Sequence, residues 1–183
     1  LWMGQVRPLA VINCDAMTAV DAAETEQELA MEVNREGVAN LARAAASAGI
    51  PLLHLSTDYV FNGAKSGAWT EDDPVDPVNF YGRSKLEGEL PVLNYENGTV
   101  VRTSWLFGPK GPNFVKTIAT KLRAGETLEV VDDQRGCPTS TAALARALLI
   151  LLESGKPGLY HFCQPPAVTW YEFSLAIADS LGV

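Results

Sequence analysis

Residues 51–58 read Pro-Leu-Leu-His-Leu-Ser-Thr-Asp, a compact apolar run that leads straight into polar side chains. This is the pattern of a buried parallel strand that delivers side chains at its C-terminal end. A second apolar run lies at 9–13, and residues 34–48 between the two runs have apolar positions at helical spacing and are ended by Gly49. The order strand, helix, strand predicts a parallel sheet, with a site where residues 51–58 end.

The same alternation continues along the rest of the chain. Helical periodicity is found at 81–93, 114–124, 141–152 and 170–181. Strand-like runs are found at 99–105, 128–131 and 159–163. Residues 62–79 hold Gly and Pro among acidic residues, which predicts a long surface loop. We therefore expect the α/β class, with a parallel sheet covered by helices on both faces.

Composition excludes several classes of function. The chain has 22 acidic residues against 14 basic ones and no cluster of Lys and Arg, so nucleic acid is not an expected partner. The 3 cysteines lie far apart and, with 2 histidines, form no recognisable metal constellation. No run approaches the length of a membrane span, and the first residues lack the blocks of a signal peptide. We expect a cytoplasmic protein that binds no membrane.

Tyr81 and Lys85 form the sharpest local feature. A four-residue offset on a helix puts the phenol and the ammonium on the same face. A cation held close to a phenol lowers its pKa from about 10 toward the range of a useful acid. The alternative is a surface contact without function. Ser56 and Thr57 favour the catalytic interpretation, because their hydroxyls end a strand where they would hydrogen-bond the same substrate oxygen.

Five segments of the chain extend this pattern. They are 56–61 (Ser-Thr-Asp-Tyr-Val-Phe), 81–89 (Tyr-Gly-Arg-Ser-Lys-Leu-Glu-Gly-Glu), 102–105 (Arg-Thr-Ser-Trp), 113–117 (Asn-Phe-Val-Lys-Thr) and 131–139 (Val-Asp-Asp-Gln, then Gly136, Pro138 and Thr139). In this order and combination they resemble the dTDP-4-dehydrorhamnose reductases, which are extended short-chain dehydrogenases/reductases. The resemblance runs from about Leu9 to Val183.

The resemblance implies a fold and a division into domains. It implies a Rossmann-like, doubly wound parallel sheet with part of a smaller C-terminal substrate domain. Residues 1–108 would form the Rossmann-like domain, incomplete at its N-terminus. Residues 109–183 would hold mixed Rossmann and substrate-domain segments, incomplete at the C-terminus.

The resemblance also implies a reaction. The family reduces the C4 ketone of dTDP-4-dehydro-L-rhamnose with NADPH or NADH and gives dTDP-L-rhamnose. Carried onto this chain, Tyr81 is the general acid, Lys85 lowers its pKa and holds the nicotinamide ribose, and Thr57 positions the carbonyl. The partner is then a nucleotide sugar, and a homodimer is compatible with the family. A Mg²⁺ ion occurs in some members, but no ligand for it can be assigned here.

The remaining site residues follow from the same resemblance. The cofactor would contact Asn13, Ala16, Ser56, Tyr81 and Lys85. The sugar would lie beside Thr18, Val20 and Trp105, and the nucleotide end beside Asn113, Gln134, Pro138 and Thr139. Alternative readings remain for three of them. Trp105 is equally well a core tryptophan, and Asn113 and Gln134 are equally well amides that cap loops.

Two departures from the family pattern stand beside the resemblance. Asp15 places an acid where the loop after the first strand should pass close to the dinucleotide, which is unfavourable unless it points away or binds ribose hydroxyls. No Gly-rich turn for the pyrophosphate occurs before Leu9. We expect either a piece of a longer protein or a truncated relative that binds dinucleotide poorly.

Two other functions are compatible with these residues. One is a non-catalytic regulatory subunit, because the family resembles the regulatory β subunit of methionine adenosyltransferase. The other is a nucleotide-sugar epimerase or dehydratase of the same class, which would also use Tyr81 and Lys85.

Overall fold

The computed structural model describes residues 5–183, which fold into two compact units. The first unit holds the described residues up to Thr103 together with Leu148–His161. The second holds Ser104–Ala147 and Phe162–Val183. The domain limits expected from the resemblance, 1–108 and 109–183, stay a prediction, because a compact unit of contacts need not coincide with a domain of the family.

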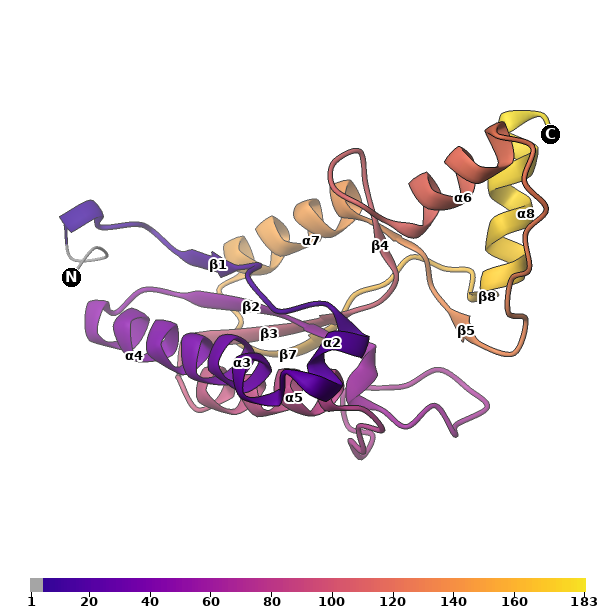
Figure 1. Cartoon of the computed structure of the whole chain (residues 1–183). Coiled ribbons are helices and arrows are strands. Elements are labelled where there is room, and N and C mark those ends of the chain that lie inside the picture. The colour runs from indigo at the N-terminus through magenta and orange to yellow at the C-terminus, as the bar shows by residue number, and fades with distance from the viewer. Residues whose placement is uncertain (1–4) are drawn as a thin grey trace. The chain divides into compact units, whose positions relative to one another are not determined.

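A four-stranded parallel sheet forms the centre of the first unit (Figure 1). Its strands, in spatial order, are β1 (Val11–Asn13), β2 (Leu52–Thr57), β3 (Gly98–Thr103) and β7 (Gly158–His161). Strand β2 pairs with β1 on one side and β3 on the other, both in parallel register. The prediction of an α/β fold with a parallel sheet is confirmed, and the quoted run 51–58 supplies a central strand.

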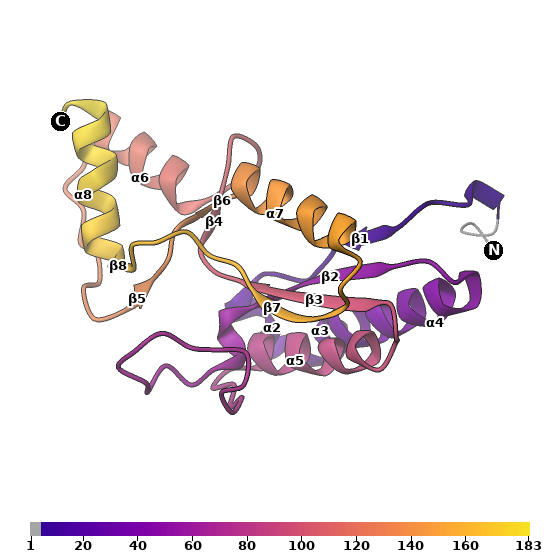
Figure 2. The same ribbon diagram turned by 180° about the vertical axis from the view of Figure 1, so that it is seen from behind.

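Helices cover both faces of this sheet (Figures 1 and 2). On one face lie α4 (Val38–Ala48) and α5 (Phe80–Leu93). The core beneath them consists of small and branched apolar side chains: Val38, Ala42, Ala45, Leu52, Val92 and Val100. The other face is covered by residues 148–154, the end of α7 (Thr141–Ser154). Helix α4 ends at Gly49, as the sequence predicted.

Two short helices and a π-helix precede α4. They are α2 (Val20–Thr25), α3 (Gln27–Met31) and η1 (Glu32–Gly37). The sequence pattern predicted a helix only from residue 34 and gave no indication of α2 or α3. Each of these helices buries a single alanine, Ala23 or Ala30, so neither carries the apolar stripe that marks an amphipathic helix.

The second unit contains two small sheets, the helices α6 and α8, and residues 141–147 of α7. Strand β4 (Leu106–Phe107) pairs in parallel with β6 (Thr139–Ser140), and β5 (Arg135–Gly136) pairs antiparallel with β8 (Val168–Thr169). Helices α6 (Phe114–Arg123) and α8 (Trp170–Leu181) pack against each other.

The prediction of a strand at 128–131 is wrong. These residues form no strand, and the Val131 carbonyl accepts a hydrogen bond from the Tyr171 backbone N–H at 3.1 Å. A short apolar run becomes a strand only when a partner strand takes up its backbone groups.

The long loop at 62–79 is confirmed, and it is fastened to β7 within the first unit. The backbone N–H of His161 donates to Glu71 Oε1 at 2.6 Å. Trp69 stacks on Phe61, with ring centroids 4.4 Å apart, and the His161 ring meets Phe61 edge-on. These contacts hold a loop without regular structure against the carboxyl end of the sheet.

A buried ion pair ties α5 to β3. Arg102 donates from Nε to Glu89 Oε1 at 2.9 Å and from Nη2 to Glu89 Oε2 at 2.7 Å. Ser56 of β2 donates to the same Oε1 at 2.5 Å. Both charged side chains are almost inaccessible, at 1% and 5% exposure. Because water cannot replace a lost partner here, removing either charge leaves the other buried and unpaired.

We predict that Glu89→Gln destabilises the protein strongly, by about 3–5 kcal/mol, because it leaves the Arg102 guanidinium buried without a counter-charge. Urea denaturation monitored by circular dichroism measures the change. Asp73→Asn is the matched control, since Asp73 pairs with Lys65 at the surface and exposed pairs contribute little. Equal losses in the two variants would contradict the assignment of Glu89 as a buried anchor.

Candidate active site

The candidate site lies where β2 ends and α5 begins. Asn79 caps the helix, and its side-chain oxygen accepts from the Gly82 N–H at 2.7 Å. Gly82 permits a close approach, because a Cβ there would lie 2.1 Å from the carbonyl oxygen of Tyr59. Tyr59 belongs to η2 (Asp58–Val60), the 3₁₀ turn that follows β2 directly. The start of α5 is thus pressed against the end of β2.

Lys85 is buried, with 3% exposure, and its ammonium is directed at β2. Nζ donates to the Leu55 carbonyl at 2.7 Å and lies 3.4 Å from Nε2 of His54. Burial lowers the pKa of Lys85 to about 8, while the negative charges of Glu89 and Asp15 act to raise it. Burial, with Lys85 as a second cause, lowers the pKa of His54 to about 3, so this imidazole is neutral at pH 7.

Tyr81 is held as a neutral phenol. Burial raises its pKa to about 12, a hydrogen bond with Thr57 acts in the opposite direction, and the charge of Asp58 adds to the rise. This direction differs from the lowered pKa expected from the spacing of Tyr81 and Lys85. The physical reason is that the ammonium is directed at Leu55 and His54, whereas burial dominates at the phenol.

The structure brings Thr57 to Tyr81 but turns Ser56 away. Successive side chains of a strand point to opposite faces. The Ser56 hydroxyl donates to Glu89 of α5, whereas the Thr57 hydroxyl donates to Asp58 Oδ1 at 3.2 Å and acts to lower the pKa of Tyr81. The expected pair of hydroxyls on one substrate oxygen is therefore not formed. The assignment of Ser56 to cofactor binding stays a prediction.

Asn34 fixes the loop that follows β1, and the sequence analysis gave it no role. Its side chain is fully buried in η1 and forms two hydrogen bonds with the Met17 backbone, at 2.9 and 3.1 Å. It also donates to Ser84 of α5 at 2.9 Å. A buried amide that satisfies both its donor and its acceptor in this way links three segments. The signal available in the sequence was a polar residue inside an otherwise apolar helical stripe.

Four of the residues expected to meet the cofactor or the sugar lie in this loop or at its two ends. Asn13 is buried, with Nδ2 3.0 Å from Nδ1 of His54. Ala16 is half-buried, Thr18 is exposed, and Val20 begins α2. Their roles stay predictions. The negative charge of Asp15 raises the pKa of Lys85, so the carboxylate lies within electrostatic reach of that ammonium.

The other predicted site residues belong to the second unit. The side chain of Asn113 caps α6 by accepting from the Lys116 N–H at 3.1 Å. A capping role was the alternative to nucleotide binding for this amide. Gln134 is exposed and Pro138 is half-buried. Thr139 is fully buried and donates to the Cys137 carbonyl at 3.0 Å. A nucleotide-binding role for these four residues stays a prediction.

Trp105 stacks on Trp170, with ring centroids 3.4 Å apart and planes inclined by 7°. Its backbone has a φ of 46°, an uncommon value for a residue other than glycine. Gly136 passes against the same ring, and a Cβ there would lie 2.3 Å from Cε2. Trp105 is therefore part of an aromatic stack in the second unit, and its contact with a sugar stays a prediction.

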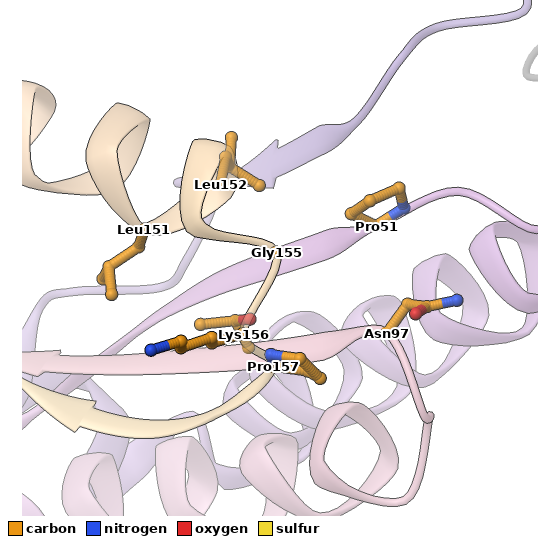
Figure 3. A pocket seen from close by; sticks show the side chains of 8 residues that line it. Pro51, Asn97, Leu151, Leu152, Gly155, Lys156 and Pro157 are labelled. Carbon is orange, nitrogen blue, oxygen red and sulfur yellow. The ribbon is translucent and has the colours of Figure 1, made fainter.

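A shallow hollow lies at the other end of the sheet (Figure 3). Its lining includes Pro51 and Asn97, which precede β2 and β3, and Leu152 and Pro157, which precede β7. In open parallel sheets, ligands bind at the carboxyl ends of the strands. This hollow lies at the amino ends, and Lys156 is the titratable side chain in its lining. The group of Thr57, Tyr81 and Lys85, at the carboxyl end of β2, is therefore the candidate site.

Comparisons with known proteins identify the family of the chain. The sequence profile of the RmlD substrate binding domain matches residues 2–183. The chain belongs to the RmlD substrate binding domain family. A dTDP-4-dehydrorhamnose reductase from Aggregatibacter actinomycetemcomitans is 44% identical over 180 residues, which is 94% of this chain and 61% of that protein. The resemblance inferred from the five sequence segments is confirmed.

Solved structures of RmlD relatives have the same fold. A dTDP-4-dehydrorhamnose reductase from Clostridium acetobutylicum matches with a TM-score of 0.96 and 40% identity, covering 100% of this chain and 65% of that one. The enzyme from Bacillus anthracis, crystallised with NADP, matches with a TM-score of 0.96 and 38% identity over the same shares. The Rossmann-like fold is thereby confirmed. The chain spans about three fifths of the length of the curated relatives it matches.

The described residues contain neither a membrane-spanning helix nor a cluster of metal-binding side chains. Within residues 5–183, no helix is long and apolar enough to cross a membrane. Across the same residues, no group of three or more His, Cys, Asp or Glu side chains is placed to hold a metal ion.

We predict that the Trp105–Trp170 stack gives an exciton couplet in the far-ultraviolet circular dichroism spectrum, because the transitions of two indoles in contact couple strongly and give bands of opposite sign when their transition moments are skewed within the stack. Trp170→Phe should abolish the couplet while the helical signal stays. Trp69→Phe is the control, because Trp69 stacks on Phe61 and not on another indole. A couplet that survives Trp170→Phe would show that the two indoles are not stacked in solution.

Proposed function

We propose that the protein reduces the C4 ketone of a dTDP-4-dehydro-6-deoxysugar with NAD(P)H, and that its substrate is dTDP-4-dehydro-L-rhamnose, which gives dTDP-L-rhamnose. The observation that carries this proposal is the group of Thr57, Tyr81 and Lys85 where β2 ends and α5 begins, with Thr57 and Lys85 buried and Tyr81 half-buried. The names of the relatives support the choice of substrate.

Tyr81 is protonated at pH 7, as the role of general acid requires, although burial makes its phenol a weaker acid than a free tyrosine. With a pKa raised to about 12, the phenol keeps its proton at pH 7 and has it to give. Proton donation to a carbonyl oxygen must accompany arrival of hydride at the carbon, so that the alkoxide never forms free. Thr57 acts on the same phenol in the opposite direction to burial and lowers its pKa.

The chain's residues fit a nicotinamide cofactor, which supplies hydride when it is bound. An ammonium group has three N–H donors. Lys85 directs one to the Leu55 carbonyl and another toward Nε2 of His54, which leaves one for a ribose hydroxyl. Asp15, close enough to act on Lys85, is an acceptor for a ribose hydroxyl. The NADP complex of the Bacillus anthracis relative supports this fit.

The finer assignments form part of the same proposal. Asn13, Ala16 and Ser56 would line the cofactor, and Thr18, Val20 and Trp105 the deoxysugar. The nucleotide end would meet four residues of the second unit: Asn113, Gln134, Pro138 and Thr139. The stack of Trp105 on Trp170 supports the sugar contact, because an aromatic platform suits a ring with an apolar methyl edge.

The full-length protein with NADPH and dTDP-4-dehydrorhamnose should consume the reduced nicotinamide, followed by its absorbance. Tyr81→Phe should lower kcat by about 100-fold or more, because a positioned acid contributes about that factor. Tyr171→Phe, an exposed position on α8, is the control and should leave kcat unchanged.

Other outcomes identify the alternatives. Cofactor that stays on the purified protein without net consumption would indicate an epimerase or dehydratase. Stoichiometric recovery of a methionine adenosyltransferase from the native source, with no turnover, would indicate a regulatory subunit. Either result would overturn the proposed reductase.

A further inference from the structure

The indole of Trp105 is held in place by the backbone around it. Trp105 lies between β3 and β4 with a positive φ, a conformation that persists in a residue other than glycine only where surrounding contacts hold it. Two such contacts are present. The Trp105 carbonyl accepts from the Thr139 backbone N–H at 3.1 Å, and the neighbouring Ser104 hydroxyl donates to the Cys137 carbonyl at 2.9 Å. Trp105 is therefore a fixed platform within the second unit.

Both faces of this platform are covered. Trp170 is stacked on one face. The backbone of Gly136 covers the other, because a Cβ at Gly136 would lie closer to Cε2 of Trp105 than to its outer neighbours Nε1 and Cζ2. An approach at the edge of the ring would bring it closer to those two outer atoms, so Gly136 lies over the face. The three atoms nearest to that Cβ all belong to Trp105, which places Trp170 on the opposite side.

Trp170 is the cover that can be moved. Gly136 covers Trp105 with its backbone, and this backbone is fixed by the pairing of Gly136 with Val168 in the β5–β8 sheet. Trp170 covers it with a side chain, from the first position of α8. A change of side-chain rotamer moves the indole and leaves the helix in place, because the capping box of Thr169 and Glu172 fixes the start of α8.

The stack of the two indoles is an exchangeable contact. Their centroids are 3.4 Å apart and their planes are inclined by 7°, so the rings overlap almost fully. Aromatic pairs prefer offset or edge-on arrangements with centroids about 4.5–7 Å apart, because the electron-rich faces of two rings repel each other. A ligand that brings C–H groups to the Trp105 face, as a deoxysugar with a methyl edge does, forms a more favourable contact with it.

The surroundings of Trp170 also permit the exchange. The ring of Phe114 lies against the Trp170 indole, with centroids 4.4 Å apart and planes inclined by 48°. Phe173, one turn further along α8, lies 6.5 Å from it. An indole that leaves Trp105 therefore keeps aromatic neighbours and is not transferred wholly to water.

We propose that Trp170 is an autoinhibitory cover of the sugar site: it occupies the one face of Trp105 that Gly136 leaves accessible, and it turns away when a deoxysugar takes that face. This rests on the proposed function, because the ligand is the sugar of a dTDP-deoxysugar. Trp170 then lowers the affinity for the sugar. A nucleotide without the sugar brings nothing to Trp105 and leaves the stack closed.

The first test is ¹⁹F NMR of the full-length protein labelled with 5-fluorotryptophan, in which Trp105→Phe and Trp170→Phe assign the two resonances. Saturating dTDP-L-rhamnose should shift both, because each ring loses the ring current of the other. The resonance of Trp69, which stacks on Phe61, should stay in place. Saturating dTDP is the control ligand and should leave positions 105 and 170 unshifted. Bound dTDP-L-rhamnose with an unshifted resonance at 170 would overturn the proposal.

The second test is the sign of an affinity change, measured by calorimetry. Trp170→Ala should bind dTDP-L-rhamnose about 2- to 10-fold more tightly than the wild type, the factor that corresponds to the loss of one aromatic pair. Its affinity for dTDP should be unchanged. Trp170→Phe keeps a ring on α8 and should show a smaller gain in the same direction, which covers the case in which Trp170→Ala does not fold. Weaker binding of dTDP-L-rhamnose by Trp170→Phe and Trp170→Ala would show that Trp170 supports the sugar and would contradict a cover.

Tyr171→Ala is the matched control variant. It removes an aromatic side chain from the same turn of α8 at an exposed position, and it should leave both affinities unchanged. A double-mutant cycle completes the test. In the Trp105→Ala background, Trp170→Ala should have no effect on dTDP-L-rhamnose, since no indole face remains to be uncovered. A gain that persists without Trp105 would count against the cover.

These measurements require neither cofactor nor turnover, so the two proposals fail separately. If dTDP-L-rhamnose opens the stack but no ketone is reduced, Trp170 is a cover and the reductase function is wrong. If the ketone is reduced and the stack stays closed around bound dTDP-L-rhamnose, the function stands and the cover is wrong. A full-length protein that does not bind dTDP-L-rhamnose would overturn both.

Discussion

The geometry of the candidate site depends on how helix α5 is oriented about its own axis. Tyr81, Lys85 and Glu89 are spaced by four residues along α5 and so lie on one stripe. The last of them is fixed by the buried pair with Arg102. A small turn of the helix would separate a carboxylate and a guanidinium that water cannot reach, at a cost of several kcal/mol. The ion pair therefore holds the acid and the lysine toward β2, although it takes no part in their chemistry.

The order of elements was readable from the sequence because buried parallel strands and amphipathic helices have different periods. The run at 51–58 became β2, and the stripe at 170–181 became α8 with the predicted bounds. Helices α2 and α3 were not readable, since their contact with the core is made by single alanines. The strand expected at 128–131 failed because strand formation requires a partner, which local sequence does not report.

The residues of the candidate site were easier to predict than their contacts. A spacing of four places Tyr81 and Lys85 on one face but does not say which group each meets. The direction of the Tyr81 pKa depends on burial, and burial is a property of the folded chain. The side chains of Ser56 and Thr57 point in different directions because successive side chains of a strand alternate between its two faces, and β2 extends to Thr57. Asn34 and Asp58 gave weaker signals, because a lone polar residue beside a strand or helix end is common.

The π-helix that contains Asn34 also marks a place where the chain length can change. A π-turn is equivalent to one residue inserted into an α-helix, and such turns are frequent at functional sites. Deleting one residue from Glu32–Gly37 would turn this segment into regular α-helix and keep α3 and α4 close to their present facing, because the π-turn already absorbs the extra residue. The same deletion inside α4 would rotate one part of that helix by about 100° against the other, since an α-helix has 3.6 residues per turn. A one-residue alignment gap between related chains is therefore expected within these six residues rather than within α4.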